Sequence, residues 1–415
     1  MRLLTSLRNT VMRIEIEKSA ARGRVYAPPS KSMAHRLLIA AAMCEGESEI
    51  VGISSCEDVL ATIDCLGTLG AKIEYRGDSV RIFGVDFLSA KARGNLACRE
   101  SGSTLRFFIP LLWLSGNEAR LVGSEKLLSR PQSVYEEIAR ERGLLLKQDG
   151  KSITVKGTLK SDEYRVRGDV SSQFITGLLF ALSLLQNDSR IVITTALESR
   201  SYIDLTISAM AEFGVMAIWE NESTLYIKGA QKYKAGHVSV EGDYSGSAFT
   251  DAFNYIGGEV EVLGLKTDSM QGDRVYKTLF SLLDEGCPDI NIEDCPDLAP
   301  ILFTLAAMKN GATFIGTRRL KIKESDRAEV MREELSKFGA DISVMENMVR
   351  ISPAKLHTPG EILFGHNDHR IVMSLAVISS VYGGVIDGCE AVRKSYPYFF
   401  SDIKKLGIKF KTYEA

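Results

Sequence analysis

The chain has 415 residues, of which 45% are apolar and 25% are charged, and its 51 basic and 53 acidic residues leave a formal net charge of −2. These values are typical of a globular protein, and they exclude intrinsic disorder and a disulfide-stapled mini-protein. A nearly neutral chain also lacks the long-range attraction that draws basic proteins to nucleic acid or anionic lipid. Any anion site must therefore be a local concentration of positive groups.

The first series of predicted elements is a set of amphipathic helices that each end in glycine and lead into a strand-like run. In chain order these glycines are Gly70, Gly143, Gly214, Gly286, Gly339 and Gly407. Glycine adopts the left-handed conformation past a helix end without a Cβ penalty, so each of the six is predicted to stop a helix. Alternating runs at 79–83 and 223–227 predict strands between the helices.

A second series of helices runs out of phase with the first and is apolar on all sides, as in 37–43 and 174–185. These helices open on small polar residues near Ser30, Ser101, Ser171, Ser245, Asp297 and Asp368. A helix without a polar face belongs inside a core, whereas the amphipathic series is expected to lie outside. The chain thus contains six copies of one unit of about 70 residues, with the fourth copy shortened near 289–297.

Six buried helices are too many for one core of this size, so the repeats predict an α/β protein with two lobes of three copies each. We expect residues 30–241 to form the N-terminal lobe. Residues 1–29 and 242–415 are expected to form the C-terminal lobe, which the strand around 14–16 joins. The chain would then cross between the lobes twice.

The cysteines and the chain start indicate the compartment. Seven cysteines without a Cys-x-x-Cys pair predict reduced thiols in the cytoplasm and no structural zinc site. The longest apolar stretches, such as 107–114, fall well short of the ~18 to 20 residues that cross a bilayer. The first eleven residues lack the apolar run of a secretory signal, and we interpret them as an extension or an upstream start.

Cations stand where the apolar helices open, among them Lys31, Arg36, Arg106 and Arg370. Capping explains the serines and aspartates at these openings, but a cation at a helix N-terminus opposes the macrodipole. Hydroxyls, free amides and cations together predict an anion site.

The motifs that are absent and the carboxylates that are present narrow the types of reaction that the chain could catalyse. No dinucleotide, P-loop or hydrolase-elbow motif occurs, and the charged run 323–327 by itself favours a solvated helix start over a site. Asp297 and Glu324 stay as isolated carboxylates, suited to proton transfer on a small polyanionic substrate. His366 and His369 stand three residues apart without a third ligand at a helical spacing, so we predict no metal site.

Eight collinear motifs between residue 24 and the C-terminus closely resemble those of the 3-phosphoshikimate 1-carboxyvinyltransferase (EPSP synthase) family of enolpyruvyl transferases. The motifs are 29–32 with Arg36, 101–106, 130–131, 171–173, 296–297, 323–327, 367–370 and 394–397. The resemblance implies two lobes, each an inside-out α/β barrel of three repeats. It also implies transfer of the enolpyruvyl group of phosphoenolpyruvate to the 5-hydroxyl of shikimate 3-phosphate, a step of the shikimate pathway towards chorismate and the aromatic amino acids. The enzyme it implies is a cytoplasmic monomer with small-molecule substrates and no cofactor.

The same resemblance assigns roles to individual residues. Asp297 would accept the proton of the attacking hydroxyl, Glu324 would protonate the methylene carbon, and Lys31 is the third catalytic residue. The implied shikimate 3-phosphate ligands are Lys31, Ser32, Arg36, Ser171, Ser172, Gln173, Ser199, Tyr202, Asp297 and Lys323. The implied phosphoenolpyruvate ligands are Lys31, Gly102, Arg130, Gln173, Arg327, Arg370 and Lys394.

Three other functions compete with this one. The sister transferase that acts on UDP-N-acetylglucosamine shares the fold and an Arg-Pro motif, but it has a reactive cysteine where this chain has Glu125. A non-catalytic sugar-phosphate sensor would be expected to lose Asp297 or Glu324, and both are present. An RNA-end-processing relative of the fold has the least support, because no basic stripe interleaved with aromatic residues occurs.

Overall fold

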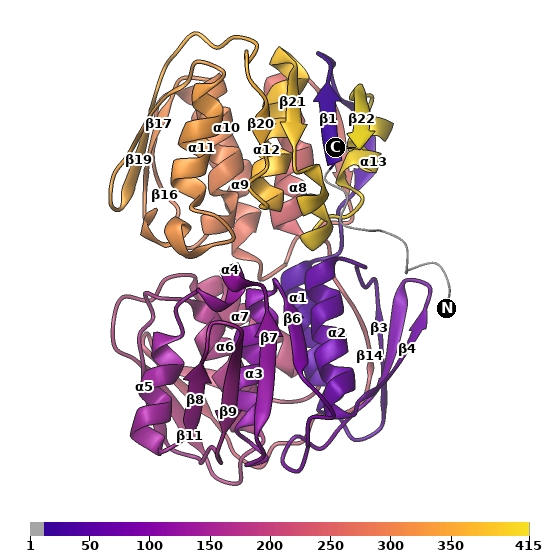
Figure 1. Cartoon of the computed structure of the whole chain (residues 1–415), viewed down its shortest axis with the longest axis vertical. Helices are drawn as coiled ribbons and strands as arrows, with labels where there is room; N and C mark the ends of the chain where they lie inside the picture. The colour runs from indigo at the N-terminus through magenta and orange to yellow at the C-terminus, as the bar shows by residue number, and fades with distance from the viewer. Residues whose placement is uncertain (1–11, 415) are drawn as a thin grey trace. The chain divides into compact units, whose positions relative to one another are not determined.

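A computed structural model describes residues 12–414, and the interpretation of the first eleven residues lies outside this range (Figure 1). The chain divides into two compact units. The N-terminal unit contains Pro29–Gly242 and Lys266–Gly272, and the C-terminal unit contains 12–28, Asp243–Leu265 and 273–414. The buried apolar side chains form a separate core in each unit. The sequence did not indicate that the short segment Lys266–Gly272 groups with the N-terminal unit.

The N-terminal unit is built from three four-stranded sheets. Its strands are β3 (Glu47–Val51), β4 (Lys72–Arg76), β5 (Ser79–Phe83), β6 (Leu96–Arg99), β7 (Ala119–Gly123), β8 (Leu145–Gln148), β9 (Ser152–Lys156), β10 (Glu163–Val166), β11 (Ser189–Ile193), β12 (Ala217–Asn221), β13 (Thr224–Ile227) and β14 (His237–Ser239). The strand orders are β14-β3-β5-β4, β6-β7-β9-β8 and β10-β11-β13-β12. In every sheet the first two strands are parallel and the others are antiparallel, so one unit is repeated three times.

The C-terminal unit contains two further four-stranded sheets of the same kind and one sheet of only two strands. Its strands are β1 (Met12–Ile16), β2 (Arg22–Tyr26), β15 (Glu259–Leu263), β16 (Asp289–Asn291), β17 (Ala312–Ile315), β18 (Asp341–Val344), β19 (Met348–Ser352), β20 (Leu363–Phe364), β21 (Gly384–Asp387) and β22 (Phe410–Glu414). The orders are β16-β17-β19-β18, β20-β21-β1-β22 and β15-β2. The strand near Ile14 thus completes the last sheet, opposite Ile386. In the fourth repeat the chain passes directly from its helix to β16, so the shortening is the loss of a hairpin.

Two helices accompany each repeat. The apolar series is α1 (Lys31–Ala42), α3 (Gly102–Leu112), α6 (Ser172–Ser183), α8 (Tyr244–Asp251), α10 (Ala299–Met308) and α12 (His369–Tyr382). The amphipathic series is α2 (Glu57–Leu69), α5 (Ser133–Arg142), α7 (Arg200–Ala211), α9 (Tyr276–Glu285), α11 (Arg327–Ser336) and α13 (Phe399–Lys405). Shorter helices are α4 (Glu125–Leu128) and the 3₁₀ turns η1 (Ala252–Ile256), η2 (Gly272–Val275), η3 (Pro296–Leu298), η4 (Arg318–Ile322) and η5 (Cys389–Lys394). The apolar series is buried along nearly its whole length, as predicted.

The predicted helix ends are confirmed at most repeats. Five of the six glycines that follow the amphipathic helices have positive φ angles, but Gly286 is extended at 172°, so the left-handed stop predicted there is wrong. The predicted serine caps and the Asp368 cap accept backbone hydrogen bonds in α1, α3, α6 and α12. In the fourth repeat Asp243 rather than Ser245 is the cap, and in the fifth Asp297 lies inside η3 instead of capping α10.

No helix within residues 12–414 is both long enough and apolar enough to span a membrane.

Candidate active site

In the N-terminal unit, Arg36 on α1 is a buried cation held by neutral oxygen atoms. Its Nε donates to the hydroxyl of Thr206 at 2.8 Å, and its Nη2 donates to the carbonyl of Tyr202 at 3.0 Å. Its Nη1 donates to the carbonyl of Ser32 at 2.6 Å, and the guanidinium lies 5.3 Å from the ring centre of Phe107. Burial without a carboxylate partner lowers the pKa of Arg36 to about 10. Such a charge gains free energy when an anion reaches it.

Lys31 opens the same helix and is tied to an acid. Its Nζ lies 2.9 Å from Oδ2 of Asp58 on α2, and both side chains are largely buried. The pair fixes the ammonium near Arg36, so two of the three implied shikimate 3-phosphate cations come from α1, and the third is Lys323.

The openings of α3 and α6 are joined through Gln173. The Oε1 of Gln173 accepts from Nη1 of Arg106 at 2.8 Å, and its Nε2 donates to the hydroxyl of Ser103 at 3.1 Å. Arg106 also donates to the carbonyl of Pro131 at 2.9 Å. Arg106 was not among the implied ligands, although the sequence flagged it as a cation at a helix opening. The structure makes it the link between Gln173 and the segment that carries Arg130.

The guanidinium of Arg130 lies against Gly102. A Cβ at Gly102 would stand 2.8 Å from Nη1 of Arg130, which is closer than side chains approach. Glycine at the first position of α3 therefore leaves the room that Arg130 occupies, and the two implied phosphoenolpyruvate ligands are neighbours.

The serines implied in shikimate 3-phosphate binding lie at two helix openings. Ser171 caps α6 by accepting from the backbone N–H of Gln173, and Ser172 is buried beside it. Ser199 precedes α7 with a φ of 59°, and its carbonyl accepts from the N–H of Tyr202. The carbonyl of Tyr202 is what Arg36 contacts, so this part of the site is built from backbone as well as side chains.

In the C-terminal unit, the carboxylate of Asp297 in η3 binds three cations. Its Oδ1 lies 3.2 Å from Nζ of Lys323 and 2.8 Å from Nη1 of Arg327, and its Oδ2 lies 2.9 Å from Nη2 of Arg370. Arg370 also donates to the Asp297 carbonyl at 3.1 Å. Burial lowers the pKa of Lys323 more than the Asp297 charge raises it. Three cations thus meet at this carboxylate, and together with Asp297 they come from three of the eight motifs.

Arg327 connects the two predicted acid–base residues. Its side chain is 1% exposed, and besides Asp297 it contacts Glu324 at 2.8 Å and Asp368 at 2.9 Å. These carboxylates, led by Asp368, raise the pKa of Arg327 despite its burial. Asp368 was expected only as a helix cap. It fills that role towards Arg370, and it is also the fully buried counter-ion of Arg327.

Asp273 in η2 is a further acid that sequence reasoning missed. It is buried and accepts a hydrogen bond from the hydroxyl of Ser245 at the start of α8. Desolvation and the nearby charge of Asp297 raise the pKa of Asp273 to about 7. Its place in a 3₁₀ turn gives no periodic signal, so only the fold shows that it is buried.

Lys394, at the end of η5, lies in the same unit. Its Nζ donates to the carbonyl of Asn367 at 2.5 Å, directly before the cap of α12. The implied phosphoenolpyruvate ligands of this unit, Arg327, Arg370 and Lys394, therefore lie within a network centred on Asp297 and the 366–370 segment.

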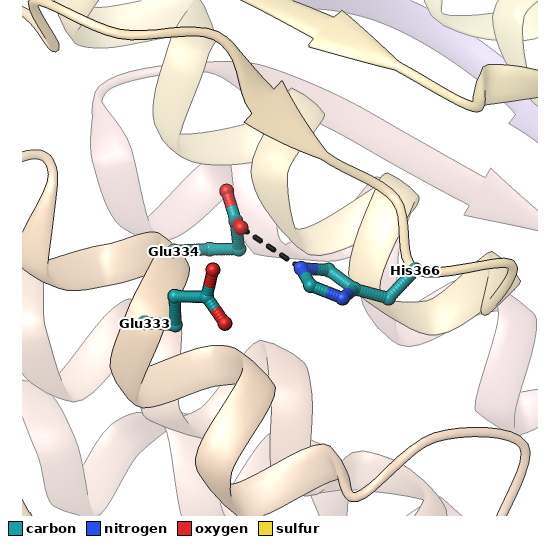
Figure 2. A group of neighbouring side chains, drawn as sticks. All are labelled: Glu333, Glu334 and His366. Carbon is teal, nitrogen blue, oxygen red and sulfur yellow. Dashed lines mark hydrogen bonds and ion pairs between the residues drawn. The ribbon is translucent and has the colours of Figure 1, made fainter.

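Within residues 12–414, one group of side chains has the spacing of a metal site: Glu333, Glu334 and His366 (Figure 2). It is not the pair considered from the sequence, since His369 is buried in α12 apart from this group. Glu334 already accepts from Lys337 at 2.9 Å on both oxygens, from His366 at 2.9 Å and from the N–H of Phe364 at 2.9 Å. An ion would have to displace these donors, and we assign no metal to the group.

Solved structures of enolpyruvyl transferases share this fold. An EPSP synthase from Acinetobacter baumannii matches with a TM-score of 0.78 at 21% identity, covering 97% of this chain and 100% of that chain. The enolpyruvyl transferase NikO from Streptomyces tendae matches with a TM-score of 0.76 at 14% identity, covering 98% and 100%. At these identities the likeness shows the architecture alone, which is the two-lobed α/β fold of enolpyruvyl transferases.

Sequence relatives define the family within this class. The profile of the EPSP synthase (3-phosphoshikimate 1-carboxyvinyltransferase) family matches residues 16–284 and 284–403. A 3-phosphoshikimate 1-carboxyvinyltransferase of Clostridium kluyveri is 41% identical, covering 95% of this chain and 97% of that protein. Its counterpart in Clostridioides difficile is 39% identical, with the same coverage. The chain belongs to the EPSP synthase family.

Proposed function

We propose that the chain catalyses the reaction for which its family is named, the transfer of the enolpyruvyl group from phosphoenolpyruvate to the 5-hydroxyl of shikimate 3-phosphate. The observation that carries the proposal is the linkage of Asp297 and Glu324 through the single guanidinium of Arg327. Two carboxylates with a shared cation between them suit a reaction that removes one proton and adds another.

The reaction has two stages. In the first, the 5-hydroxyl loses its proton and attacks C2 of phosphoenolpyruvate while the methylene C3 gains a proton, which gives a tetrahedral ketal that still carries the phosphate. In the second, the methyl carbon loses a proton, the C2–O bond to phosphate breaks and the vinyl group is restored. Atoms and charge balance with inorganic phosphate as the second product, and no electrons are gained or lost.

We assign Asp297 as the base for the hydroxyl and Glu324 as the acid for carbon, with Lys31 assisting from the opening of α1. Arg327 and Arg370 contact the Asp297 carboxylate and hold it in place to accept the hydroxyl proton. Glu324 lies 2.8 Å from Arg327, which places its carboxyl beside the same guanidinium that contacts Asp297.

Shikimate 3-phosphate is assigned to the N-terminal unit together with Asp297 and Lys323. Ser32, Arg36, Ser171, Ser172, Gln173, Ser199 and Tyr202 supply hydroxyls, amides and a buried cation suited to a phosphorylated polyol. The buried Arg36 is the main support for this assignment, because its hydrogen-bond partners among residues 12–414 are neutral oxygen atoms.

Phosphoenolpyruvate is assigned to Lys31, Gly102, Arg130, Gln173, Arg327, Arg370 and Lys394. Five of these residues are lysines or arginines, which suits a substrate that carries both a carboxylate and a phosphate. Their charges would also stabilise the negative charge that develops on phosphate as it leaves. Both substrates are multiply charged metabolites, which supports a cytoplasmic enzyme, and we propose that it acts as a monomer.

The deciding experiment is release of inorganic phosphate by the purified chain. We expect release from phosphoenolpyruvate with shikimate 3-phosphate and none with UDP-N-acetylglucosamine as the acceptor. Release with the nucleotide sugar alone would identify the sister activity. Calorimetric binding of shikimate 3-phosphate without any turnover would identify a sensor, and either result would overturn the proposal.

A further inference from the structure

The segment that leads into α12 is a tight turn with an unusual backbone. The N–H of Asp368 donates to the carbonyl of Gly365 at 2.8 Å, which closes a four-residue turn. Its two central residues, His366 and Asn367, have φ angles of 48° and 53°. Positive φ at both central positions is the requirement of a type I′ turn, which glycine and asparagine adopt more easily than histidine. A non-glycine residue persists there only when its surroundings hold it.

The side chain of His366 is held by a buried carboxylate. Its Nε2 lies 2.9 Å from Oε1 of Glu334, which projects from α11 and is fully buried (Figure 2). The other oxygen of Glu334 accepts from the N–H of Phe364 at 2.9 Å, two residues before His366. The Glu334 carboxylate therefore makes hydrogen bonds on both sides of Gly365, and Lys337 balances the charge of this carboxylate.

The same turn presents two of the cations assigned to phosphoenolpyruvate. The carbonyl of Asn367 accepts from Nζ of Lys394 at 2.5 Å. Asp368 follows and accepts from the N–H of Arg370 at 3.0 Å as the cap of α12. A change of φ at His366 would rotate the Asn367 carbonyl and the cap together, and would move Lys394 and Arg370 with them.

We propose that His366 and Glu334 are positioning residues that lock this turn and thereby place Lys394 and Arg370 for phosphoenolpyruvate. The inference rests on the proposed function and adds two residues that belong to none of the eight motif assignments. Neither residue is among the implied substrate ligands. Their effect is on binding of one of the two substrates and not on the proton transfers at Asp297 and Glu324.

The test compares three variants in steady-state phosphate release. H366A removes the hydrogen bond and tolerates positive φ poorly, so its KM for phosphoenolpyruvate should rise about tenfold, with kcat within about threefold and an unchanged KM for shikimate 3-phosphate. H366G also loses the bond but adopts positive φ freely, so its KM should rise less, by about threefold. K337M removes a different partner of the same carboxylate. It should lower thermal stability and leave both KM values near those of the wild type.

The comparison separates positioning from general destabilisation. An H366A variant with an unchanged KM for phosphoenolpyruvate overturns the inference, as does a K337M variant whose KM rises as much as that of H366A. If H366A does not fold, the KM difference between H366G and K337M decides in the same way. A wild type that releases no phosphate from the two substrates overturns the proposed function and this inference together, whereas an active wild type with an unaltered H366A overturns the inference alone.

Discussion

The two units use the openings of their apolar helices in opposite ways. In the N-terminal unit the openings carry hydroxyls and amides, and the buried Arg36 is surrounded by neutral oxygens that leave its charge uncompensated. In the C-terminal unit the corresponding openings carry Asp297 and Asp368, and Arg327 is neutralised by carboxylates. One repeated fold thus places a buried cation among neutral oxygens in one unit and a cluster of carboxylates and cations in the other.

The contrast in charge compensation gives a physical reason for the proposed division between substrate binding and proton transfer. A buried cation without an acid is costly until an anion arrives, so it favours binding. A carboxylate that contacts several cations is held in place, so it can accept a proton at a fixed position. The predictions below test each side of this comparison.

The largest expected effect is on the chemical step, from Glu324→Gln. The amide keeps the shape and can still accept from Arg327, but it cannot carry a proton, so kcat should fall by about 10³-fold, within the range for a lost general acid. The matched control is Glu329→Gln, at a half-buried residue near the start of the adjoining helix α11 whose carboxylate pairs with Arg332. Stopped-flow or steady-state phosphate release measures both, and comparable activity in the two variants would remove Glu324 from the chemistry.

The second effect is on stability and contrasts two buried arginines. Arg327→Met leaves Asp368 buried without its counter-ion, so the free energy of unfolding should fall by about 3 to 5 kcal/mol. Arg36→Met removes a charge that has no acidic partner, so its change should stay within about 1 kcal/mol, set by the lost hydrogen bonds. Urea denaturation of the pair measures the difference. Equal losses of unfolding free energy in the two variants would contradict the distinction between a cation paired with carboxylates and a cation among neutral oxygens.

The third effect is on the pH dependence of stability and concerns Asp273. Because burial raises its folded-state pKa to about 7, the carboxyl is protonated when folded but ionised when unfolded between about pH 4 and 7. The free energy of unfolding should therefore fall as the pH rises through this window, by ~2.5 kcal/mol between pH 5 and 8 from this group alone.

Asp273→Asn removes that titration and can still accept the hydrogen bond from Ser245. The variant should be more stable than the wild type at pH 8, and the two curves should approach each other near pH 4. Urea unfolding across this range would show parallel curves if Asp273 were ionised throughout.

The smallest effect compares one helix stop from each unit. Gly143 in the N-terminal unit has a φ of 65°, whereas Gly286 in the C-terminal unit is extended at 172°, and neither has an atom within 4 Å of the place a Cβ would take. Gly143→Ala should cost about 1 kcal/mol of unfolding free energy from backbone strain alone, and Gly286→Ala close to nothing. Differential scanning calorimetry of the two variants checks this, and a larger loss from Gly286→Ala would contradict the conformational explanation.

The repeats could be predicted from the sequence because their signals are local. Apolar helices such as 174–185, alternating strands and glycines such as Gly70 depend on short-range periodicity and backbone preference. The left-handed stop predicted at Gly286 is wrong because the chain leaves α9 in an extended conformation and runs directly to β16, without the hairpin that follows α2, α5, α7 and α11.

The interior of the site could not be predicted in the same way. The contact of Arg327 with Asp368 joins residues 41 apart, and the raised pKa of Asp273 depends on burial that no local pattern encodes. Positive φ at His366 has no sequence signal either, because only a few per cent of non-glycine residues adopt it, even though histidine is enriched among them. The resemblance supplied the residues of the site, and the fold supplied which of them compensate one another.

The most direct test of the central claim is calorimetric titration of shikimate 3-phosphate into the wild type, Arg36→Met and Glu324→Gln. The account predicts that Arg36→Met loses at least about 10²-fold in affinity, as expected when a buried charge-assisted contact is removed. It predicts that Glu324→Gln binds as tightly as the wild type although it no longer turns over. Retained affinity in Arg36→Met together with lost affinity in Glu324→Gln would contradict the assignment of binding to the N-terminal unit and proton transfer to the C-terminal unit.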